Sequence, residues 1–339
     1  MKKIILIIGF ISLGILHSTH VFSQFSASEA RSNYQNSKAN DKGLDRHERY
    51  TSIGGSLNAL NYFGDLAPFE GNFSTDLSLT RPGLGFVISR RFTPRISVRG
   101  TYTFGRLRGD DISADPIAER SRDRFRRNLH FRNDIHEVAV TGVVDLLANR
   151  DDYTQRRWLT PYAFLGIGIF HHNPRAKVPV NMGDEWVNLR DFRTEGVSYS
   201  RIQFVVPYGL GARLKLTERL DLALELGIRQ LFFDYIDDAS NVYVDPGTLG
   251  SDLARIMAAR SLEPIAAATG EQRLPEFIQN ANNRIIQYQS SDGNTYPVFE
   301  GNSPGNRRGN PNDYDIYLVT SLQLTYIIMP RAGRAKYRN

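Results

Sequence analysis

Residues 314–328, YDIYLVTSLQLTYII, alternate between apolar and polar side chains along their whole length. The even positions carry Tyr314, Ile316, Leu318, Thr320, Leu322, Leu324, Tyr326 and Ile328, whereas the odd positions include Asp315, Ser321, Gln323 and Thr325. Successive side chains on a strand point to opposite faces, so this stretch predicts a β-strand with one apolar and one polar face. Tyr314 and Tyr326, near its two ends, fit the aromatic girdles that flank a membrane-spanning strand.

Seven further stretches carry the same alternation. They are residues 50–62, 81–91, 96–107, 129–147, 158–170, 199–215 and 220–233. The clearest of them is 220–233, where every even position from Leu220 to Ile228 is apolar while Asp221, Glu225 and Arg229 share the other face. A continuous period of 3.6 residues appears in none of them, so the chain is expected to be all-β.

The connections between these strands alternate in length. The second, fourth and sixth are short, at about 92–95, 148–157 and 216–219, and the others are longer, at about 63–80, 108–128, 171–198 and 234–313. Short periplasmic turns opposite long outside loops are typical of an up-and-down barrel in an outer membrane. The sequence therefore predicts an eight-stranded transmembrane β-barrel with long extracellular loops and both termini in the periplasm. Residues 249–261 predict a helix in the seventh loop, because a connection of this length needs structure of its own.

The two ends of the chain are expected to lie outside the barrel. Residues 1–23 have Lys2 and Lys3 before a short apolar run and a small Ser23, the pattern of a cleavable signal peptide. We expect a flexible periplasmic segment over 24–49, the barrel over 50–330 and a basic periplasmic tail over 331–339.

Composition excludes several other classes of protein. After the signal peptide no run of eighteen apolar residues occurs, which excludes a helical membrane protein. The chain has no Cys, so disulfides, thiolate metal sites and a Cys nucleophile are excluded. The formal net charge of +6 is spread among many acids and does not indicate nucleic-acid binding. No cofactor is expected.

Short motifs at the strand ends form a recognisable series. They are residues 61–66 (NYFGDL), 81–85 (RPGLG), 92–99 (FTPRISVR), 109–111 (GDD), 127–132 (RNLHFR), 160–168 (TPYAFLGIG), 207–211 (PYGLG) and 234–240 (DYIDDAS). This series resembles the small outer-membrane barrels of Bacteroidota that include PorG of the type IX secretion system. The resemblance covers roughly 50–245 and the last strand. It implies association with a periplasmic ring made of a lipoprotein and its partner.

Five charged residues fall on the faces predicted to point into the barrel. They are Arg99, Glu137, Arg213, Glu225 and Arg229. An eight-stranded barrel is just wide enough to be filled by side chains, and an unpaired buried charge is costly. We therefore expect a structural network of ion pairs in the lumen; the functional alternative is a gate or a proton path.

The third long loop and the start of the strand after it are rich in arginine from Arg120 to Arg132, with Arg106 and Arg108 across from them. Its candidates for contact with phosphate groups, lipopolysaccharide or an acidic partner are Arg122, Arg124, Arg126 and Arg127. The alternative is a solvated loop that neutralises itself through nearby acids such as Asp111 and Asp123.

Candidates for docking to periplasmic ring subunits lie in the short turn 148–157 and in the tail. They are Arg156, Arg157, Arg331 and Arg334. The alternative is that these are ordinary solvated turn and tail residues.

Catalytic and metal sites receive little support. His130, Asp134 and His136 share one strand face near the outer rim, but no nucleophile motif accompanies them, so no enzyme is expected. The acids Asp234, Asp237, Asp238 and Asp245 match no standard calcium loop. His171 and His172 should point to opposite faces of a strand, which disfavours a shared metal.

The sequence as a whole predicts a non-catalytic outer-membrane barrel. By the resemblance, it would be an accessory component of a type IX protein secretion machine that anchors periplasmic ring subunits. The alternative is a structural or surface-recognition barrel that acts through its long loop at 234–313.

Overall fold

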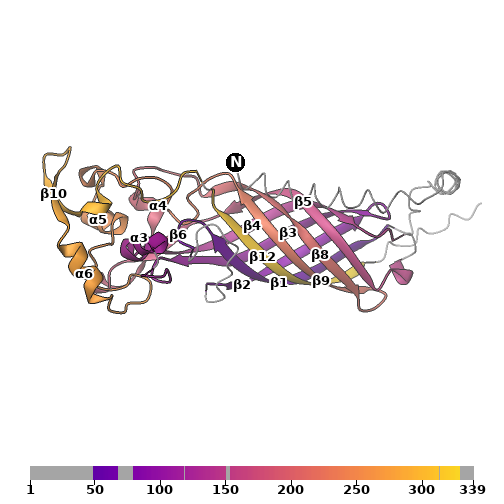
Figure 1. Cartoon of the computed structure of the whole chain (residues 1–339). Coiled ribbons are helices and arrows are strands. Elements are labelled where there is room, and N and C mark those ends of the chain that lie inside the picture. The colour runs from indigo at the N-terminus through magenta and orange to yellow at the C-terminus, as the bar shows by residue number, and fades with distance from the viewer. Residues whose placement is uncertain (1–48, 68–78, 118, 150–152, 313, 329–339) are drawn as a thin grey trace, which may run out of the picture. The chain divides into compact units, whose positions relative to one another are not determined.

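Eight long antiparallel strands form the body of the protein (Figure 1). They are β1 (Thr51–Phe63), β2 (Arg81–Arg91), β3 (Ile96–Asp110), β4 (His130–Asp145), β5 (Leu159–His171), β8 (Ile202–Lys215), β9 (Leu220–Leu231) and β12 (Ile316–Ile328). The computed structural model describes residues 49–67, 79–117, 119–149, 153–312 and 314–328. All eight predicted strands are present, most within a few residues of their expected bounds.

The sheet closes on itself. Each of the eight strands pairs with its neighbours in the chain, and β1 pairs with β12 from Thr51↔Ile328 to Phe63↔Ile316. The pairing of β3 with β4 completes the ring. The predicted all-β, up-and-down, eight-stranded barrel is therefore confirmed. Below, the turn end is the end with the short connections 92–95, 146–158 and 216–219, and the cap end is the opposite one.

Apolar side chains cover the outside of the barrel. Phe204 is 73% exposed and Ile167 is 72% exposed, and each of the other strands has at least one exposed large apolar residue on its outer face, such as Leu57 of β1 and Leu84 of β2. Leu322, Leu324 and Tyr326 on β12 belong to this outer face, whereas Ser321 and Gln323 on the opposite face of the strand are buried. A continuous exposed apolar belt of this size marks a surface that water does not cover.

The inside of the barrel has two chemically different halves. Toward the turn end it holds charged and polar side chains. Toward the cap end it holds a hydrophobic core that includes Leu60, Leu107, Phe131, Phe170 and Leu231. The same core extends to Ala176, Leu189, Ala239 and Met257 in the long connections. The cap end of the barrel is thus filled like the core of a water-soluble domain. The sequence pattern predicted polar residues on the inner faces of the strands and therefore did not predict this apolar core.

The long connections at the cap end contain further elements, which together form the cap. Its strands are β6 (Pro174–Lys177), β7 (Trp186–Asn188), β10 (Ile285–Gln289) and β11 (Thr295–Phe299). Its helices are α3 (Glu119–Arg127), α4 (Leu189–Phe192), α5 (Asp252–Ala258) and α6 (Pro275–Asn282). Its 3-10 turns are η2 (Val180–Met182), η3 (Pro246–Thr248) and η4 (Glu300–Asn302), and η1 (Tyr153–Gln155) lies at the turn end. β6 pairs with β4, β7 pairs with β6, and β10 and β11 form a separate hairpin.

The helix predicted over 249–261 is shorter than expected. The helix that forms is α5, which begins after Ser251 because the Ser251 hydroxyl accepts a hydrogen bond from the Ala254 amide at 3.1 Å and caps the helix there.

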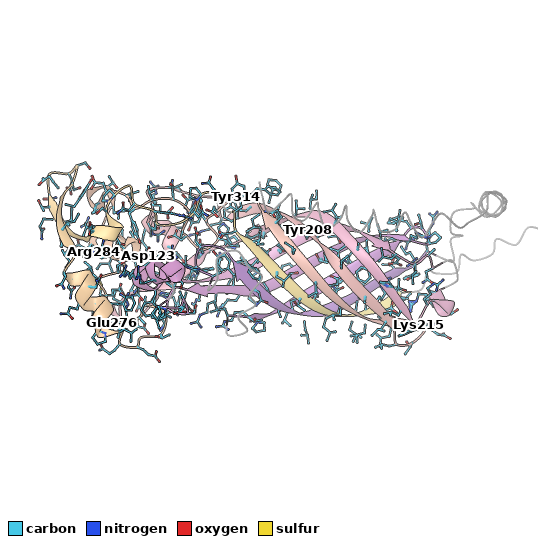
Figure 2. The ribbon with its side chains drawn as sticks, viewed as in Figure 1. Asp123, Tyr208, Lys215, Glu276, Arg284 and Tyr314 are labelled. Carbon is cyan, nitrogen blue, oxygen red and sulfur yellow. The ribbon has the colours of Figure 1, made fainter. Side chains whose placement is uncertain are left out.

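Figure 2 shows Asp123 of α3 in the cap and Lys215 of β8 at the turn end of the barrel.

Some predictions concern residues outside those described. These are the signal peptide at 1–23, most of the segment 24–49 and the basic tail at 331–339. Across the described ranges, no helix is both long enough and apolar enough to cross a membrane.

Candidate functional site

The middle of the barrel lumen is crossed by two ion pairs. Arg99 of β3 pairs with Glu225 of β9, and the Tyr162 hydroxyl donates to the same carboxylate at 2.6 Å. One layer toward the cap, Arg229 Nε lies 3.2 Å from Glu137 Oε2, which also accepts from the Tyr317 hydroxyl at 2.6 Å. Each buried carboxylate therefore has both an opposite charge and a hydrogen bond from a tyrosine hydroxyl close by, as burial requires.

A second set of ion pairs lies at the turn end. Asp145 accepts from Arg91 at 3.0 Å and pairs with Arg213 at 3.4 Å. Arg156 pairs with Asp221 at 2.9 Å. All five predicted lumen charges thus face inward and take part in ion pairs. The prediction omitted Arg91, Asp145 and Asp221, although the inward parity of Asp145 and Asp221 on their strands could have identified them.

Little free space remains between these side chains. The cavity that Arg99, Glu225 and Arg229 line has a volume of about 20 Å³, which is room for roughly one water molecule. Beyond it, toward the cap, the hydrophobic core fills the lumen. In the described part of the chain, the barrel interior is therefore a packed core.

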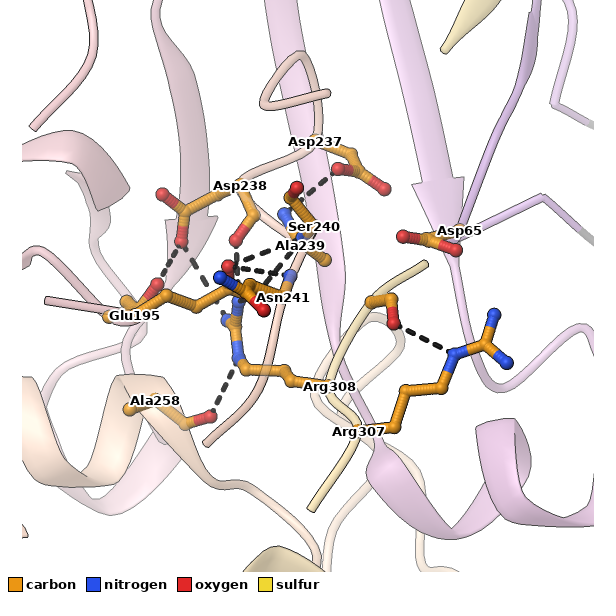
Figure 3. A network of polar contacts seen from close by, with 12 residues as sticks. Asp65, Glu195, Asp237, Asp238, Ala239, Ser240, Asn241, Ala258, Arg307 and Arg308 are labelled. Atoms are coloured by element: carbon orange, nitrogen blue, oxygen red, sulfur yellow. Dashed lines mark hydrogen bonds and ion pairs between the residues drawn. The ribbon is translucent and has the colours of Figure 1, made fainter. Parts of the chain in front are cut away.

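Arg308 holds three parts of the cap together (Figure 3). Its Nη1 donates to Glu195 Oε1 at 2.9 Å and to the Asp238 carbonyl, and its Nε donates to the Ala258 carbonyl at 3.1 Å. Glu195 in turn accepts from the amides of Ser240 and Asn241 at 3.1 and 2.9 Å. This cluster, which we call the Arg308 clasp, joins the β7–β8 connection to both ends of the β9–β12 connection.

A group of carboxyl groups is buried where the β9–β12 connection leaves the barrel. The Tyr62 hydroxyl lies 2.6 Å from Asp237 Oδ2 and 2.9 Å from Asp315 Oδ1. Burial, with the negative charge of Asp65 nearby, raises the pKa of Asp237 to about 8. Burial and the charge of Asp237 raise the pKa of Asp234 to about 9, and the pKa of Asp315 is also raised well above its usual value.

The cap contains a pocket of about 650 Å³. Its walls are mainly apolar and include Val178, Leu249, Ile256, Leu262 and Val298. Arg255 lies at its polar part, with its guanidinium 4.9 Å from the centre of the Tyr296 ring. The volume falls within the range of small-molecule sites.

The arginines of α3 do not form an outward-facing belt, as contact with external phosphate groups would require. Arg127 donates to both oxygens of buried Asp111 at 2.8 and 2.7 Å, and Arg124 is buried beside the same carboxylate. The guanidinium of Arg126 lies over the Phe277 ring, and Arg122 is exposed. Phosphate contact is therefore the wrong interpretation for Arg124 and Arg127, and the self-neutralising alternative is confirmed for these two, because Asp111 is their internal ion-pair partner.

The docking prediction also needs a correction at Arg156. Its side chain is only 6% exposed and donates to Asp221 and to the Thr217 and Glu218 carbonyls, so it closes the turn end from within. Arg157 is exposed and remains available to a partner. Arg331 and Arg334 lie outside the described residues.

The histidine candidates take separate partners. His130 is buried and accepts from the Lys177 amide at 3.0 Å, whereas Asp134 pairs with Arg106 at 2.5 Å. His136 is exposed on the outer face, with its Nδ1 2.9 Å from the Tyr102 hydroxyl. These contacts bring the three residues into no common site.

His171 and His172 point to opposite faces, as expected. His171 is exposed, and its ring centre lies 6.2 Å from that of His136. His172 is buried, and burial lowers its pKa to about 4, so it is neutral at physiological pH.

The acids considered for calcium also diverge. Asp238 accepts from the Tyr199 hydroxyl at 2.8 Å, whereas Asp245 accepts from Gly247 and Ser291 amides. Over the residues that the structure covers, no group of three His, Cys, Asp or Glu side chains has the arrangement to hold a metal ion.

Comparison with known proteins gives the family but no function. Residues 45–245 match the model of the family described as "Domain of unknown function (DUF6089)", and the chain belongs to that family. No curated protein matches the chain.

Several solved barrels are similar in structure. The outer membrane protein OprG from Pseudomonas aeruginosa has 9% identity and a TM-score of 0.37, covering 85% of this chain and 99% of that one. Ail, the attachment invasion locus protein of Yersinia pestis, has 11% identity and a TM-score of 0.31, covering 83% and 97%. Neisserial surface protein A has 8% identity and a TM-score of 0.32, covering 82% and 96%.

Proposed function

We propose that this chain is a non-catalytic outer-membrane barrel that acts through its surfaces. The observation that carries the proposal is the combination of an exposed apolar belt with a filled lumen. The belt needs a lipid environment, and the filled lumen leaves no route for a solute. The turn end would face the periplasm and the cap would face the outside, since short turns lie on the periplasmic side of such barrels.

The more specific proposal is an accessory role in a type IX protein secretion machine. The barrel would anchor the periplasmic ring lipoprotein and its partner to the outer membrane. The resemblance of the strand-end motifs supports this role, and a closed barrel suits an anchor better than a pore. Of the expected docking residues, exposed Arg157 and the tail residues Arg331 and Arg334 remain candidates.

A gentle-detergent pull-down from native envelopes tests this role. We expect a periplasmic ring lipoprotein and its partner to co-purify in stoichiometric amounts. Replacing Arg157, Arg331 and Arg334 with Glu should weaken that association, whereas Arg122→Glu on the cap is the matched control. A barrel that comes out alone would rule out the accessory role, and unchanged recovery with the triple variant would rule out these docking residues.

The second candidate function is recognition of a ligand or partner outside the cell. The specific observation is the mainly apolar pocket of about 650 Å³ in the cap. Ile256→Glu would place a charge in the pocket wall, and Gln287→Glu on the exposed face of β10 is the control. Loss of cell-surface binding with the first variant alone would favour recognition over anchoring.

A further inference from the structure

Three arginines occupy directly opposite positions on neighbouring strands at the cap end. Arg108 of β3 is the register partner of Arg132 of β4, and Arg132 is the partner of Arg175 of β6. Opposite residues of antiparallel strands point to the same face, with Cβ atoms about 5 Å apart. We call these three residues the arginine row.

The arginine row lies on the outer face of the barrel. Arg108 has the same parity as exposed Phe104 on β3, and Arg132 has the same parity as exposed Val138 on β4. Their neighbours of opposite parity, such as Leu107, belong to the buried core. The row therefore faces the surroundings of the barrel.

The charges of the row are incompletely compensated. Arg108 lies 3.4 Å from Asp110. Arg132 and Arg175 have no carboxylate within 4.0 Å among the residues that the structure describes. Asp134 acts electrostatically on both Arg132 and Arg175, but it already pairs with Arg106. Like charges directly opposite each other on adjacent strands are destabilising, and this one carboxylate does not neutralise three further guanidinium groups.

Neutral groups hold the two guanidinium groups that lack a carboxylate. The Arg132 guanidinium carbon lies 3.8 Å from the centre of the Trp186 ring, and Arg175 Nε donates to Asn188 Oδ1 at 2.9 Å. Stacking and a single Nε bond fix the planes of both groups. No residue that the structure describes bonds to their terminal nitrogens, which are therefore available for the paired N–H bonds that guanidinium groups make to phosphate.

The height of the row relative to the apolar belt indicates what covers it. The outward apolar positions of β3 end at Phe104, and Arg106, paired with Asp134 at 2.5 Å, comes next. Arg108 is four residues beyond Phe104, which is about 10 Å of height for a tilted strand. That is past the headgroup layer of an ordinary phospholipid, whose polar region is about 5–7 Å thick. The phosphorylated sugars of lipopolysaccharide extend to this level.

We propose that the arginine row binds the phosphate groups of lipopolysaccharide in the outer leaflet. The anion offsets the repulsion between the three guanidinium groups and fits their fixed planes. The site differs from the α3 arginines predicted from the sequence, of which Arg124 and Arg127 are buried. This inference rests on the outer-membrane location proposed above.

Binding of lipopolysaccharide to the purified chain in neutral detergent tests the proposal. We expect the double variant Arg132→Gln, Arg175→Gln to bind about ten-fold more weakly, because two charge-assisted contacts are lost. The control Arg122→Gln, Arg157→Gln removes the same charge from two exposed positions and should change binding less than about two-fold. Equal binding by the two double variants would overturn the proposal.

Two further arms identify the source of the phosphate. Lipopolysaccharide stripped of its phosphate groups should bind the unaltered protein as weakly as intact lipopolysaccharide binds the row variant. Inorganic phosphate at millimolar concentration should not compete. Undiminished binding of the stripped lipid, or effective competition by free phosphate, would each contradict lipopolysaccharide phosphates as the ligand.

Folding and location are measured separately. Removing two like charges should leave the thermal unfolding temperature in lipid-free detergent unchanged or higher. In that case misfolding does not explain weaker binding by the row variant.

Membrane fractionation of cells that make the unaltered chain tests the outer-membrane location by itself. If the chain is absent from the outer membrane, the proposed function is refuted. If the chain is in the outer membrane but the row variant binds lipopolysaccharide as the unaltered chain does, only the role of the arginine row is refuted.

Discussion

The hydroxyl of Tyr62 in the first strand lies 2.6 Å from Oδ2 of Asp237 in the last long connection. The same hydroxyl lies 2.9 Å from Asp315 Oδ1. A phenol has one proton to donate, so both contacts are satisfied together only when one of the two carboxyl groups keeps its own proton. The raised pKa values of Asp237 and Asp315 agree with this geometry: the two carboxyl groups together hold at least one proton.

The cap should lose stability as the pH rises. Unfolded aspartates release their protons near pH 4, whereas Asp237 and Asp234 in the folded protein hold theirs up to about pH 8 and 9. Their stabilising contribution is complete below about pH 4 and declines as the pH rises through the folded pKa values, because the folded state binds more protons in that window. Thermal unfolding in detergent at pH 5 and pH 9 measures this difference.

Asp237→Asn should reduce that pH dependence, because the amide stays neutral throughout. Asp123→Asn on the exposed face of α3 is the matched control and should leave the dependence as it is. Identical pH profiles for the two variants would show that the carboxyl cluster does not hold protons.

Breaking a lumen ion pair should strongly destabilise the barrel. Glu137→Ala leaves Arg229 and the Tyr317 hydroxyl buried without their acceptor, and the expected loss is about 3–5 kcal/mol. Replacing both Glu137 and Arg229 with Met should cost much less, since no charge is left unpaired. Urea unfolding followed by the mobility shift of folded barrels on gels gives both values. A double variant as unstable as the single one would contradict the ion-pair account.

The barrel should not conduct ions. The cavity beside the ion pairs holds roughly one water molecule, and the hydrophobic core closes the cap end. Planar-bilayer recordings are expected to show no stable open level, even for Glu137→Ala, because Phe131 and Phe170 still fill the lumen. A steady conductance from the unaltered chain would refute the packed interior.

Asp111 should be the residue that keeps α3 in place. Asp111→Ala removes the acceptor of Arg127 and of the Leu129 amide, and we expect about 3–5 kcal/mol less local stability. Trypsin, which cleaves after arginine, should then cut α3 much faster than in the unaltered protein. The exposed Asp123→Ala on the same helix is the control and should resist digestion as the unaltered protein does.

The strands could be predicted from the sequence because their outside and inside face different surroundings. Where the inside is polar, as at Ser321 and Gln323, apolar and polar residues alternate and the strand is obvious. Near the cap the pattern is reversed, because Leu107 points into the core while Arg106 and Arg108 on either side of it point outward, and the alternation alone does not reveal this change.

The candidate site was harder to predict because its partners are distant in the sequence. Glu195 and Arg308 lie in different connections, and no local pattern joins them. Likewise, the sequence of α3 shows a run of arginines, but only the fold brings Asp111 beneath two of them. Arg108 and Arg132 of the arginine row lie in the arginine-rich region that the sequence shows, but Arg175 was missed because it belongs to β6, a short strand with no alternation long enough to recognise.

The pairing of β1 with β12 also fixes the order in which the molecule can be assembled. β12 follows the long connection 232–315, whose Ile236 and Ala239 belong to the core at the cap end. The ring closes only when this last strand pairs with both β1 and β9. A chain cut short before β12 would therefore keep two open strand edges, on β1 and on β9, and could not form the closed barrel.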